Sequence, residues 1–198
     1  MNKAIFLDRD GTINKLRFNK LLNEYEPPHQ PEEFELIDGV IDALRSFRKN
    51  EYLLFVISNQ PDYAKGKCSM DDLLTVHSEF KRQMNIKGVN ITEYFYCYHH
   101  PNGVVPDYSY DCECRKPKPY FAVKAIEEYD IDKSVSWFIG DRDSDILCGK
   151  LAGLKTVYLT SGQGLGIGEL AENIRATDLK EASELILKYN LKDYAISK

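Results

Sequence analysis

The segment KAIFLDRDGT, residues 3–12, decides how this chain is expected to fold. Residues 3–7 form a short, mainly apolar run of the kind that makes a buried strand. Asp8 and Asp10 follow this run directly, and a Gly-Thr pair comes next. Open parallel sheets bind ligands beyond the carboxyl ends of their strands. The segment therefore predicts an interior strand with a polar site at its end.

The rest of the chain alternates between strand-like and helix-like patterns. Apolar or β-rich runs are found at residues 52–57, 91–96, 135–139 and 155–159. Apolar residues recur at helical spacing near residues 37–47, 73–84, 121–129, 167–174 and 179–189. Asp38 is placed as an N-cap, and Ser69 with Asp72 as a capping box. This alternation predicts an α/β fold, a Rossmann-like parallel sheet with helices on both faces. The Pro- and Glu-rich stretch 24–33 is expected to be a surface loop.

The length, net charge and cysteine count of the chain limit the classes of protein to which it can belong. The chain has 198 residues, a formal net charge of −5, 43% hydrophobic and 29% charged residues, which is typical of one soluble globular domain, residues 1–198. The acidic balance argues against nucleic-acid partners. No apolar run is long enough for a signal peptide or a membrane span. Five cysteines, an odd number, argue against a disulfide framework. We expect a cytoplasmic monomer without nucleic-acid or membrane partners.

Polar clusters follow three of the expected strands, at residues 8–10, 58–60 and 140–145. In a parallel sheet these clusters meet at one edge. The four carboxylates gathered there, those of Asp8, Asp10, Asp141 and Asp145, would repel one another and take up protons. A hard divalent cation removes that conflict, and Mg²⁺ prefers carboxylate, water and phosphate oxygens. Each aspartate alone could be a turn residue or a helix cap, but the set together favours a magnesium site.

The same cluster holds the parts for phosphoryl transfer. A carboxylate can attack phosphorus, and a second one two residues on can protonate the leaving alcohol and then deprotonate water. Ser58, Asn59 and Lys116 offer donors and a cation for the phosphoryl group. The pattern predicts Mg²⁺-dependent phosphoryl transfer through an aspartyl-phosphate.

Four ordered motifs resemble those of the haloacid dehalogenase (HAD) superfamily. They are FLDRDGT at 6–12, SNQ at 58–60, KPKP at 116–119 and GDRDSD at 140–145. The resemblance implies Asp8 as nucleophile and Asp10 as general acid/base. It implies Mg²⁺ held by Asp8, the backbone carbonyl of Asp10, and Asp141. Ser58 and Lys116 would hold the phosphoryl group, and Asp145 would support the site through a metal-bound water or Lys116.

A second cluster consists of thiols and one imidazole. Cys97, His99, Cys112 and Cys114 make a Cys₃His set suited to tetrahedral Zn²⁺. The loop between them, 100–111, has little apolar content, so a metal could hold its shape. Four protein ligands leave no coordination position for water or substrate, so the zinc would be structural. His100 is a rival ligand. Ordinary reduced thiols are the alternative, and the Cys-x-Cys spacing does not favour a redox pair.

Zinc loops of this form resemble one branch of the superfamily, which holds phosphatases of heptose bisphosphates and of histidinol phosphate. The His-His-Pro start and the loop length look more like the heptose enzymes. That resemblance implies substrate contacts from Arg115 and Arg142. The intervals between the motifs leave no room for an inserted cap domain, so we expect the HAD fold without a cap domain and with a zinc loop at 97–114. Selectivity then falls on residues 14–33, residues 60–68 and the zinc loop.

Three features depart from the pattern of that branch. Tyr98 stands where the branch usually has proline, Pro61-Asp62 stands where it has small residues, and the stretch 14–31 is longer. A carboxylate at position 62 would repel a second phosphate unless something neutralises it. Five basic residues could meet that phosphate or be solvated surface: Lys15, Arg17, Lys20, Lys65 and Lys67.

The leading hypothesis is a Mg²⁺-dependent phosphatase of D-glycero-D-manno-heptose 1,7-bisphosphate that removes the 7-phosphate. Histidinol phosphate is the alternative substrate. A zinc-stapled phospho-acceptor or binding module without turnover is the alternative from another class. Asp10 separates this last class from an enzyme, because an acceptor needs no acid/base two residues after it.

Overall fold

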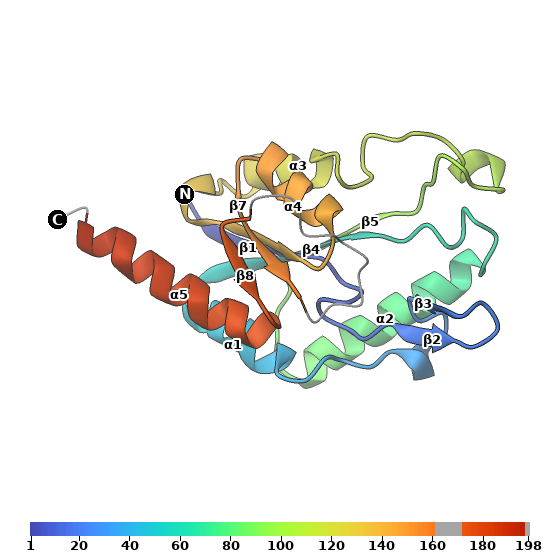
Figure 1. The fold of residues 1–198 in the computed structure, drawn as a ribbon, viewed down its shortest axis with the longest axis horizontal. Coiled ribbons are helices and arrows are strands. Elements are labelled where there is room, and N and C mark those ends of the chain that lie inside the picture. The colour runs from blue at the N-terminus through green and yellow to red at the C-terminus, as the bar shows by residue number, and fades with distance from the viewer. Residues whose placement is uncertain (161–171, 197–198) are drawn as a thin grey trace.

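A six-stranded parallel sheet forms the centre of the protein in the computed structural model, which describes residues 1–160 and 172–196 (Figure 1). The strand order is β5-β4-β1-β6-β7-β8, and every neighbouring pair is parallel. The strands are β1 Lys3–Leu7, β4 Tyr52–Asn59, β5 Glu93–Cys97, β6 Trp137–Gly140, β7 Lys155–Leu159 and β8 Ile174–Ala176. The α/β architecture predicted from the alternating pattern is confirmed.

Helices cover both faces of the sheet, as predicted. They are α1 Val40–Lys49, α2 Met70–Ile86, α3 Tyr120–Glu128, α4 Asp143–Leu151 and α5 Leu179–Ile196. Helices α1, α2 and α5 contribute to one apolar core, and α3 and α4 to the other, on the opposite side of the sheet in Figure 1. Strand β1 serves both, because Ile5 and Leu7 enter the first core and Ala4 and Phe6 the second. Burial on both faces explains why interior strands read as continuous apolar runs.

Several expected boundaries change in the structure. Helix α1 begins after Gly39, an N-cap with a left-handed φ of 79°, so Asp38 is not the cap. The Ser69–Asp72 capping box is present as predicted. The apolar run at 135–139 becomes a strand only from Trp137, because a 3₁₀ turn occupies Lys133–Val135. The helix expected near 167–174 lies mostly outside the described residues, and strand β8 begins at Ile174.

The stretch 24–33 is not simply a surface loop. It contains strand β3 Glu24–Glu26, which pairs antiparallel with β2 Arg17–Asn19, and a 3₁₀ turn at Pro31–Glu33. The hairpin lies at the end of the molecule away from the C-terminus (Figure 1). It was missed because its short strands are largely exposed, so no alternating apolar pattern marks them.

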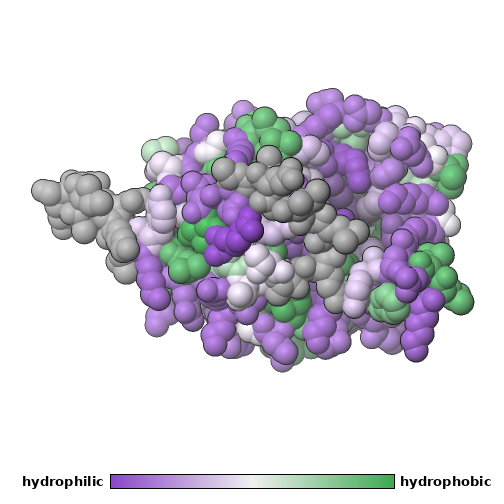
Figure 2. All heavy atoms as spheres, viewed as in Figure 1, coloured by the Kyte–Doolittle hydropathy of each residue, from purple (hydrophilic) through white to green (hydrophobic). Residues whose placement is uncertain are grey.

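The hairpin segment leaves and rejoins the core at neighbouring points. Asn14 and Leu36 form an isolated bridge, and the Lys15 N–H donates to the Glu35 carbonyl at 2.8 Å. Apolar side chains gather at the hairpin end of a mostly hydrophilic face (Figure 2). The exposed ones on the hairpin are Phe18, Leu21, Leu22 and Tyr25.

No helix in the described ranges is long and apolar enough to cross a membrane.

Candidate active site

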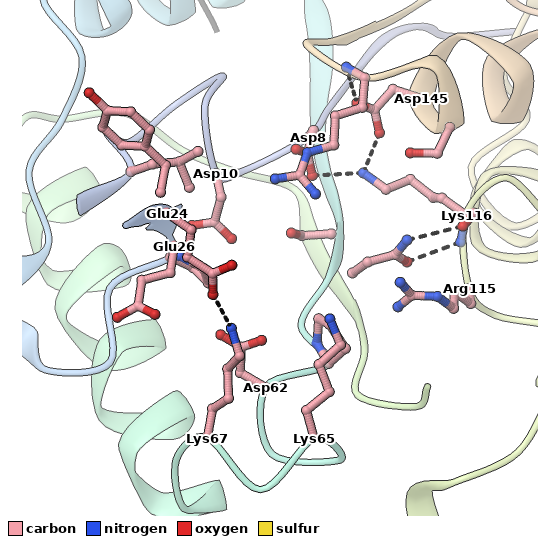
Figure 3. A pocket seen from close by; sticks show the side chains of 18 of the residues that line it. Asp8, Asp10, Glu24, Glu26, Asp62, Lys65, Lys67, Arg115, Lys116 and Asp145 are labelled. Carbon is pink, nitrogen blue, oxygen red and sulfur yellow. Dashed lines mark hydrogen bonds and ion pairs between the residues drawn. The ribbon is translucent and has the colours of Figure 1, made fainter. Parts of the chain in front are cut away.

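The carboxyl ends of the adjacent strands β4, β1 and β6 meet at one edge of the sheet. Asp8 follows β1, Ser58 and Asn59 end β4, and Asp141 follows β6. A pocket of about 720 Å³ opens at this edge, within the range of small-molecule sites (Figure 3). The sequence-predicted residues that line it are Asp8, Asp10, Ser58, Asn59, Arg115, Lys116, Arg142 and Asp145. The structure therefore brings the expected polar clusters together.

Lys116 is the buried cation of the site. Its ammonium donates to Asp8 Oδ1 and the Ile57 carbonyl and forms an ion pair with Asp145 Oδ1, each at 2.7 Å. Burial alone would lower the pKa of Lys116, but the carboxylates of Asp145 and Asp8 raise it above its ordinary value. The lysine is therefore held in its charged form beside Asp8, where a reacting phosphoryl group would gain negative charge.

Asp141 is fully buried with no hydrogen-bond partner for either carboxylate oxygen among the described residues. Burial, followed by the charges of Asp8 and Asp145, raises the pKa of Asp141 to about 8. Ligand oxygens of these three aspartates lie within 4.8 Å of one another. An unpartnered buried carboxylate beside two others fits a hard divalent cation, because the cation would satisfy it and remove the repulsion. Gly11 permits this approach, since a Cβ there would overlap the Asp141 carboxylate.

The two carboxylate oxygens of Asp145 make different contacts, and the sequence predicted only one of them. One oxygen is paired with Lys116, which is one of the two supporting roles expected for it. The other accepts the Arg142 backbone N–H at 3.1 Å and so caps helix α4. Burial raises the pKa of Asp145 to about 6, against the opposing charge of Lys116. Gly140 makes room for it, because a Cβ there would overlap the Asp145 side chain.

Asp10 is surrounded by donors that sequence reasoning did not single out. The Arg9 guanidinium donates to both carboxylate oxygens at 3.0–3.1 Å, and Asn14 Nδ2 donates to Oδ1 at 2.9 Å. Gln60 Nε2 also donates to Asp10, through Oδ2. All of these side chains are buried. Arg9 adjoins Asp10 in sequence and Gln60 is part of the quoted SNQ motif, so both were visible but had no role in the sequence argument.

Asn59 has a different geometry from the one expected of a phosphate ligand. Its Nδ2 donates to the Lys116 carbonyl, and its Oδ1 accepts the Lys116 backbone N–H, both at 3.0 Å. The side-chain amide thus binds a peptide group and fixes the segment that carries Lys116.

The thiol cluster is assembled as the spacing predicted. Cys97 Sγ lies 3.5 Å from Cys112 Sγ, which lies 3.4 Å from Cys114 Sγ. His99 Nδ1 lies 3.8 Å from Cys97 Sγ and 3.4 Å from Cys114 Sγ. Tetrahedral zinc with bonds of about 2.3 Å to sulfur separates its sulfur ligands by about 3.8 Å, so the four atoms fit that metal.

The structure favours His99 over its neighbour as the imidazole of this cluster. His100 Nδ1 accepts the Asn102 backbone N–H at 3.1 Å. Tyr110, which sequence reasoning missed, places its hydroxyl 2.9 Å from His99 Nε2. Such a partner on the second nitrogen orients a metal-binding imidazole.

Three cations on the pocket wall lack an ion-pair partner. Within the described ranges, Lys65, Arg115 and Arg142 have no carboxylate at ion-pair distance. Burial, with the nearby charges of Lys67 and Arg115, lowers the pKa of Lys65. Figure 3 places Lys65 and Arg115 on the same side of the pocket. This is an arrangement that an anion would stabilise.

The other basic candidates pair with carboxylates or are solvated. Lys67 is 2.8 Å from Glu24 of the hairpin, Arg17 pairs with Glu26 and Glu33, and Lys15 pairs with Glu35. Lys20 is exposed.

Asp62 is buried and hydrogen-bonded, and the cations Lys65 and Lys67 lie near its charge. His29 Nε2 lies 2.7 Å from Asp62 Oδ2. Burial alone would raise the pKa of Asp62, but the hydrogen bond and charge of His29, with Lys67 and Lys65, lower it. His29 was expected on a loop surface, and that expectation is wrong, since only 9% of the residue is exposed.

Comparisons with known proteins identify the class of protein. A family model described as HAD-hydrolase-like matches residues 113–182. The D-glycero-beta-D-manno-heptose-1,7-bisphosphate 7-phosphatase of Pasteurella multocida is 38% identical over 164 residues, which are 82% of this chain and 84% of that protein. The D-glycero-alpha-D-manno-heptose-1,7-bisphosphate 7-phosphatase of Photorhabdus laumondii is 36% identical over 185 residues, 93% of this chain and 96% of that protein.

A solved structure supports the fold. The D,D-heptose 1,7-bisphosphate phosphatase from B. bronchiseptica, complexed with magnesium and phosphate, superposes with a TM-score of 0.78 at 24% identity. The match covers 94% of this chain and 99% of that one.

The fold and the relatives define an enzyme, a HAD-like phosphatase that hydrolyses phosphoric monoesters. Within that class, the chain belongs to the family of the D-glycero-D-manno-heptose-1,7-bisphosphate 7-phosphatases.

Proposed function

We propose that this phosphatase removes the 7-phosphate from a D-glycero-D-manno-heptose 1,7-bisphosphate. The observation that carries the proposal is the pocket itself. In it, the carboxylates of Asp8 and Asp10 share one space with cations that have no carboxylate partner among the described residues. The printed names of the relatives supply the sugar. Those names include both the α and the β anomer of the sugar, so the assay must compare the two anomers.

The first chemical step uses both aspartates of the β1 end. A carboxylate oxygen of Asp8 attacks phosphorus, and the bond from phosphorus to the sugar oxygen breaks. Asp10 gives its proton to the departing sugar oxygen. The products of this step are a phosphorylated Asp8 and the free sugar hydroxyl.

The second step returns the enzyme to its starting state. A water molecule attacks phosphorus, and Asp10 takes the proton of that water. The bond between phosphorus and the Asp8 oxygen breaks, which releases inorganic phosphate and restores the Asp8 carboxylate. Across both steps, one water is consumed and one phosphate ester is hydrolysed.

Metal and donors would stabilise the charge of the transferring group. Magnesium held by Asp8, the Asp10 carbonyl and Asp141 would supply electrostatic stabilisation of the phosphoryl oxygens. Lys116 adds a fixed positive charge beside Asp8. Ser58 lines the pocket with a hydroxyl that can donate to a phosphoryl oxygen.

The second phosphate of the substrate would meet the cationic wall. Lys65, Arg115 and Arg142 line the pocket and have no carboxylate partner among the described residues. Asp62 lines the same pocket, and the nearby cations Lys67 and Lys65 offset its charge. A bisphosphate is therefore favoured over histidinol phosphate, whose cationic amine would face these three cations.

Zinc at Cys97, His99, Cys112 and Cys114 would serve a structural role. Cys114 directly precedes Arg115 and Lys116, so its position fixes the backbone that carries both cations. The carbonyl of Cys97 also accepts the Gln60 backbone N–H at 2.7 Å. The metal would thus hold two walls of the pocket at once.

A panel of phosphate-release assays tests this function. The substrates are the α and β anomers of heptose 1,7-bisphosphate, histidinol phosphate, a hexose bisphosphate and p-nitrophenyl phosphate, each with Mg²⁺ and with a chelator. We expect the highest kcat/KM with one heptose anomer and, by ³¹P NMR, a product that retains the 1-phosphate. No Mg²⁺-dependent release from any of these esters would overturn the proposal. A higher kcat/KM for histidinol phosphate would reassign the substrate.

A further inference from the structure

A buried amide side chain joins the phosphoryl-binding hydroxyl to the acid/base carboxylate. Gln60 is 2% exposed and follows Ser58 and Asn59 at the end of β4. Its Nε2 donates to Ser58 Oγ at 2.9 Å and also to Asp10 Oδ2. No role for this residue follows from the motifs quoted above.

The orientation of the amide is set by its third contact. Gln60 Oε1 accepts from Arg9 Nη2 at 2.7 Å. Because a guanidinium can only donate, the amide oxygen must face Arg9, and the amide nitrogen must face Ser58 and Asp10. Every polar atom of the Gln60 side chain therefore has a partner, and a rotation of the amide would break all three contacts.

This orientation has a consequence for Ser58. The hydroxyl oxygen of Ser58 accepts from Gln60, so its own O–H remains available to donate. Ser58 lines the pocket beside Asp8, where the phosphoryl group would lie. Gln60 thus directs the Ser58 donor toward the phosphoryl group while it holds the carboxylate of Asp10.

Further contacts of the Arg9 side chain and of the Gln60 backbone hold this network in place. The Arg9 guanidinium lies over the Tyr96 ring, 5.6 Å from its centre, and the Tyr96 hydroxyl lies 3.0 Å from His77 Nδ1. The Gln60 backbone is fixed by the Cys97 carbonyl. Buried polar networks in which every member is satisfied hold their side chains in one geometry.

We propose that Gln60 is a positioning residue for proton transfer. It fixes the carboxylate of Asp10 relative to the phosphoryl group that Ser58 would hold. The proposal rests on the proposed function, in which Asp10 protonates the leaving sugar oxygen. In this role Gln60 acts through Asp10 and Ser58 and does not itself contact the substrate. Its effect should therefore depend on how much the leaving group needs a proton.

The leaving group supplies a readout that a purely structural role would not change. A sugar alkoxide needs a proton in order to depart, whereas p-nitrophenolate departs without one. The quantity to compare is kcat/KM, because it reports the steps up to loss of the leaving group and not the later hydrolysis of the phosphorylated aspartate.

The test uses Gln60→Met, which keeps the length of the side chain and removes its donor and acceptor. We expect kcat/KM for the sugar phosphate to fall by about 10–100-fold, and for p-nitrophenyl phosphate by less than about 3-fold. Gln60→Glu is the second variant, since it keeps the shape and the acceptor for Arg9 but presents oxygen to Asp10 and Ser58. It should show a loss on both substrates, because Ser58 would then donate to the introduced carboxylate, and a larger loss on the sugar phosphate. That difference between the two losses carries the test if Gln60→Met does not fold.

Other outcomes separate the failure of this inference from failure of the proposed function. Equal losses on both substrates, or no loss on either, in a folded variant would overturn the role of Gln60 and leave the phosphatase activity in place. No phosphate release by the wild-type protein from either ester would remove the proposed function, and this inference with it.

Discussion

The imidazole of His29 lies 2.7 Å from the carboxylate of Asp62, and the two residues come from segments that sequence alone would not pair. His29 follows the β2–β3 hairpin, and Asp62 lies in the loop after β4. Together they close the hairpin segment against the loop that carries Lys65 and Lys67, beside the Lys67–Glu24 ion pair. The contact also holds the carboxylate of Asp62 at a fixed position on the wall of a pocket suited to a bisphosphate.

Replacement of His29 by leucine should weaken both folding and substrate binding. The variant leaves Asp62 buried without its partner, so we expect the free energy of unfolding to fall by about 1–3 kcal/mol in urea titrations. KM for the bisphosphate should rise more than kcat falls, because the Asp62 carboxylate is then no longer held against residue 29 and can turn toward the second phosphate. His29→Gln, which can still donate to Asp62, is the matched control. Asp62→Asn in the His29→Leu background should restore KM, and an unchanged KM there would contradict this reasoning.

The same pair has a predictable pH dependence. The pKa of Asp62 in the folded state lies below its ordinary value, so the contact stabilises the fold above the unfolded pKa and loses this effect as the pH falls through the folded pKa. The difference in free energy of unfolding between wild type and Asp62→Asn should therefore become smaller below about pH 4. A difference that is constant from neutral to acid pH would argue against the charge of Asp62 as its source.

Asp10→Asn should abolish turnover and keep the fold. Asparagine preserves the size of the side chain but cannot exchange a proton, so we expect kcat for the sugar phosphate to fall by about 10²–10⁴-fold. Phosphate release and circular dichroism measure the two effects separately. A folded Asp10→Asn variant with wild-type kcat would remove Asp10 from the acid/base role.

Lys65→Met tests whether the cationic wall recognises a second phosphate. We expect KM for the bisphosphate to rise about 10-fold, the effect of losing one charge-assisted contact of about 1.4 kcal/mol. KM for p-nitrophenyl phosphate, which has no second phosphate, should stay within about 2-fold. Lys20→Met, at an exposed position of the hairpin turn, is the control. Equal effects on both substrates would place the second phosphate elsewhere.

Cys114→Ser should lower activity through the cations that follow it in sequence. Loss of one thiolate weakens zinc binding, and the backbone at Arg115 and Lys116 then loses its fixed position. We expect less than one zinc per chain by metal analysis and a fall in kcat/KM of at least about 10-fold. Cys68→Ser makes the same chemical change outside the cluster and should change neither quantity. A folded, zinc-free Cys114→Ser protein with full activity would show that the zinc loop and the pocket are independent.

Gly140→Ala should disturb the support of Lys116 without touching the substrate. The added Cβ would overlap the Asp145 side chain, which pairs with Lys116 and caps α4. We expect about 1–3 kcal/mol of lost stability and a reduced kcat. Gly88→Ala is the comparison, because a Cβ there has open space, although its left-handed φ of 67° adds backbone strain. If Gly140→Ala reduces stability but not kcat, Asp145 is only a helix cap.

The central sheet and the site were predictable for one physical reason. Strands buried on both faces are continuous apolar runs, and the polar residues that end them must meet at one edge. Asp8, Ser58 and Asp141 follow from that rule. The thiol cluster was predictable because metal ligands have restricted chemistry and spacing.

What the sequence did not reveal depends on contacts between distant segments. Nothing local pairs His29 with Asp62, and nothing local shows that the Asn59 amide binds the Lys116 peptide group. Gly39 replaced Asp38 as the cap of α1 because the chain enters that helix through a left-handed residue, which glycine adopts without strain. The hairpin lacked a signal because it buries little apolar surface.

The bridge between Asn14 and Leu36 has a consequence for how this protein can diversify. Its two sides are neighbours in space, so the residues between them form a closed excursion from the core. Such an excursion can lengthen, shorten or be exchanged for another while the register of β1 and the placement of Asp8 stay the same. The hairpin side of the pocket and the residues around Asp8 are in this way on separable parts of the chain, so that side of the pocket could be exchanged at this one junction.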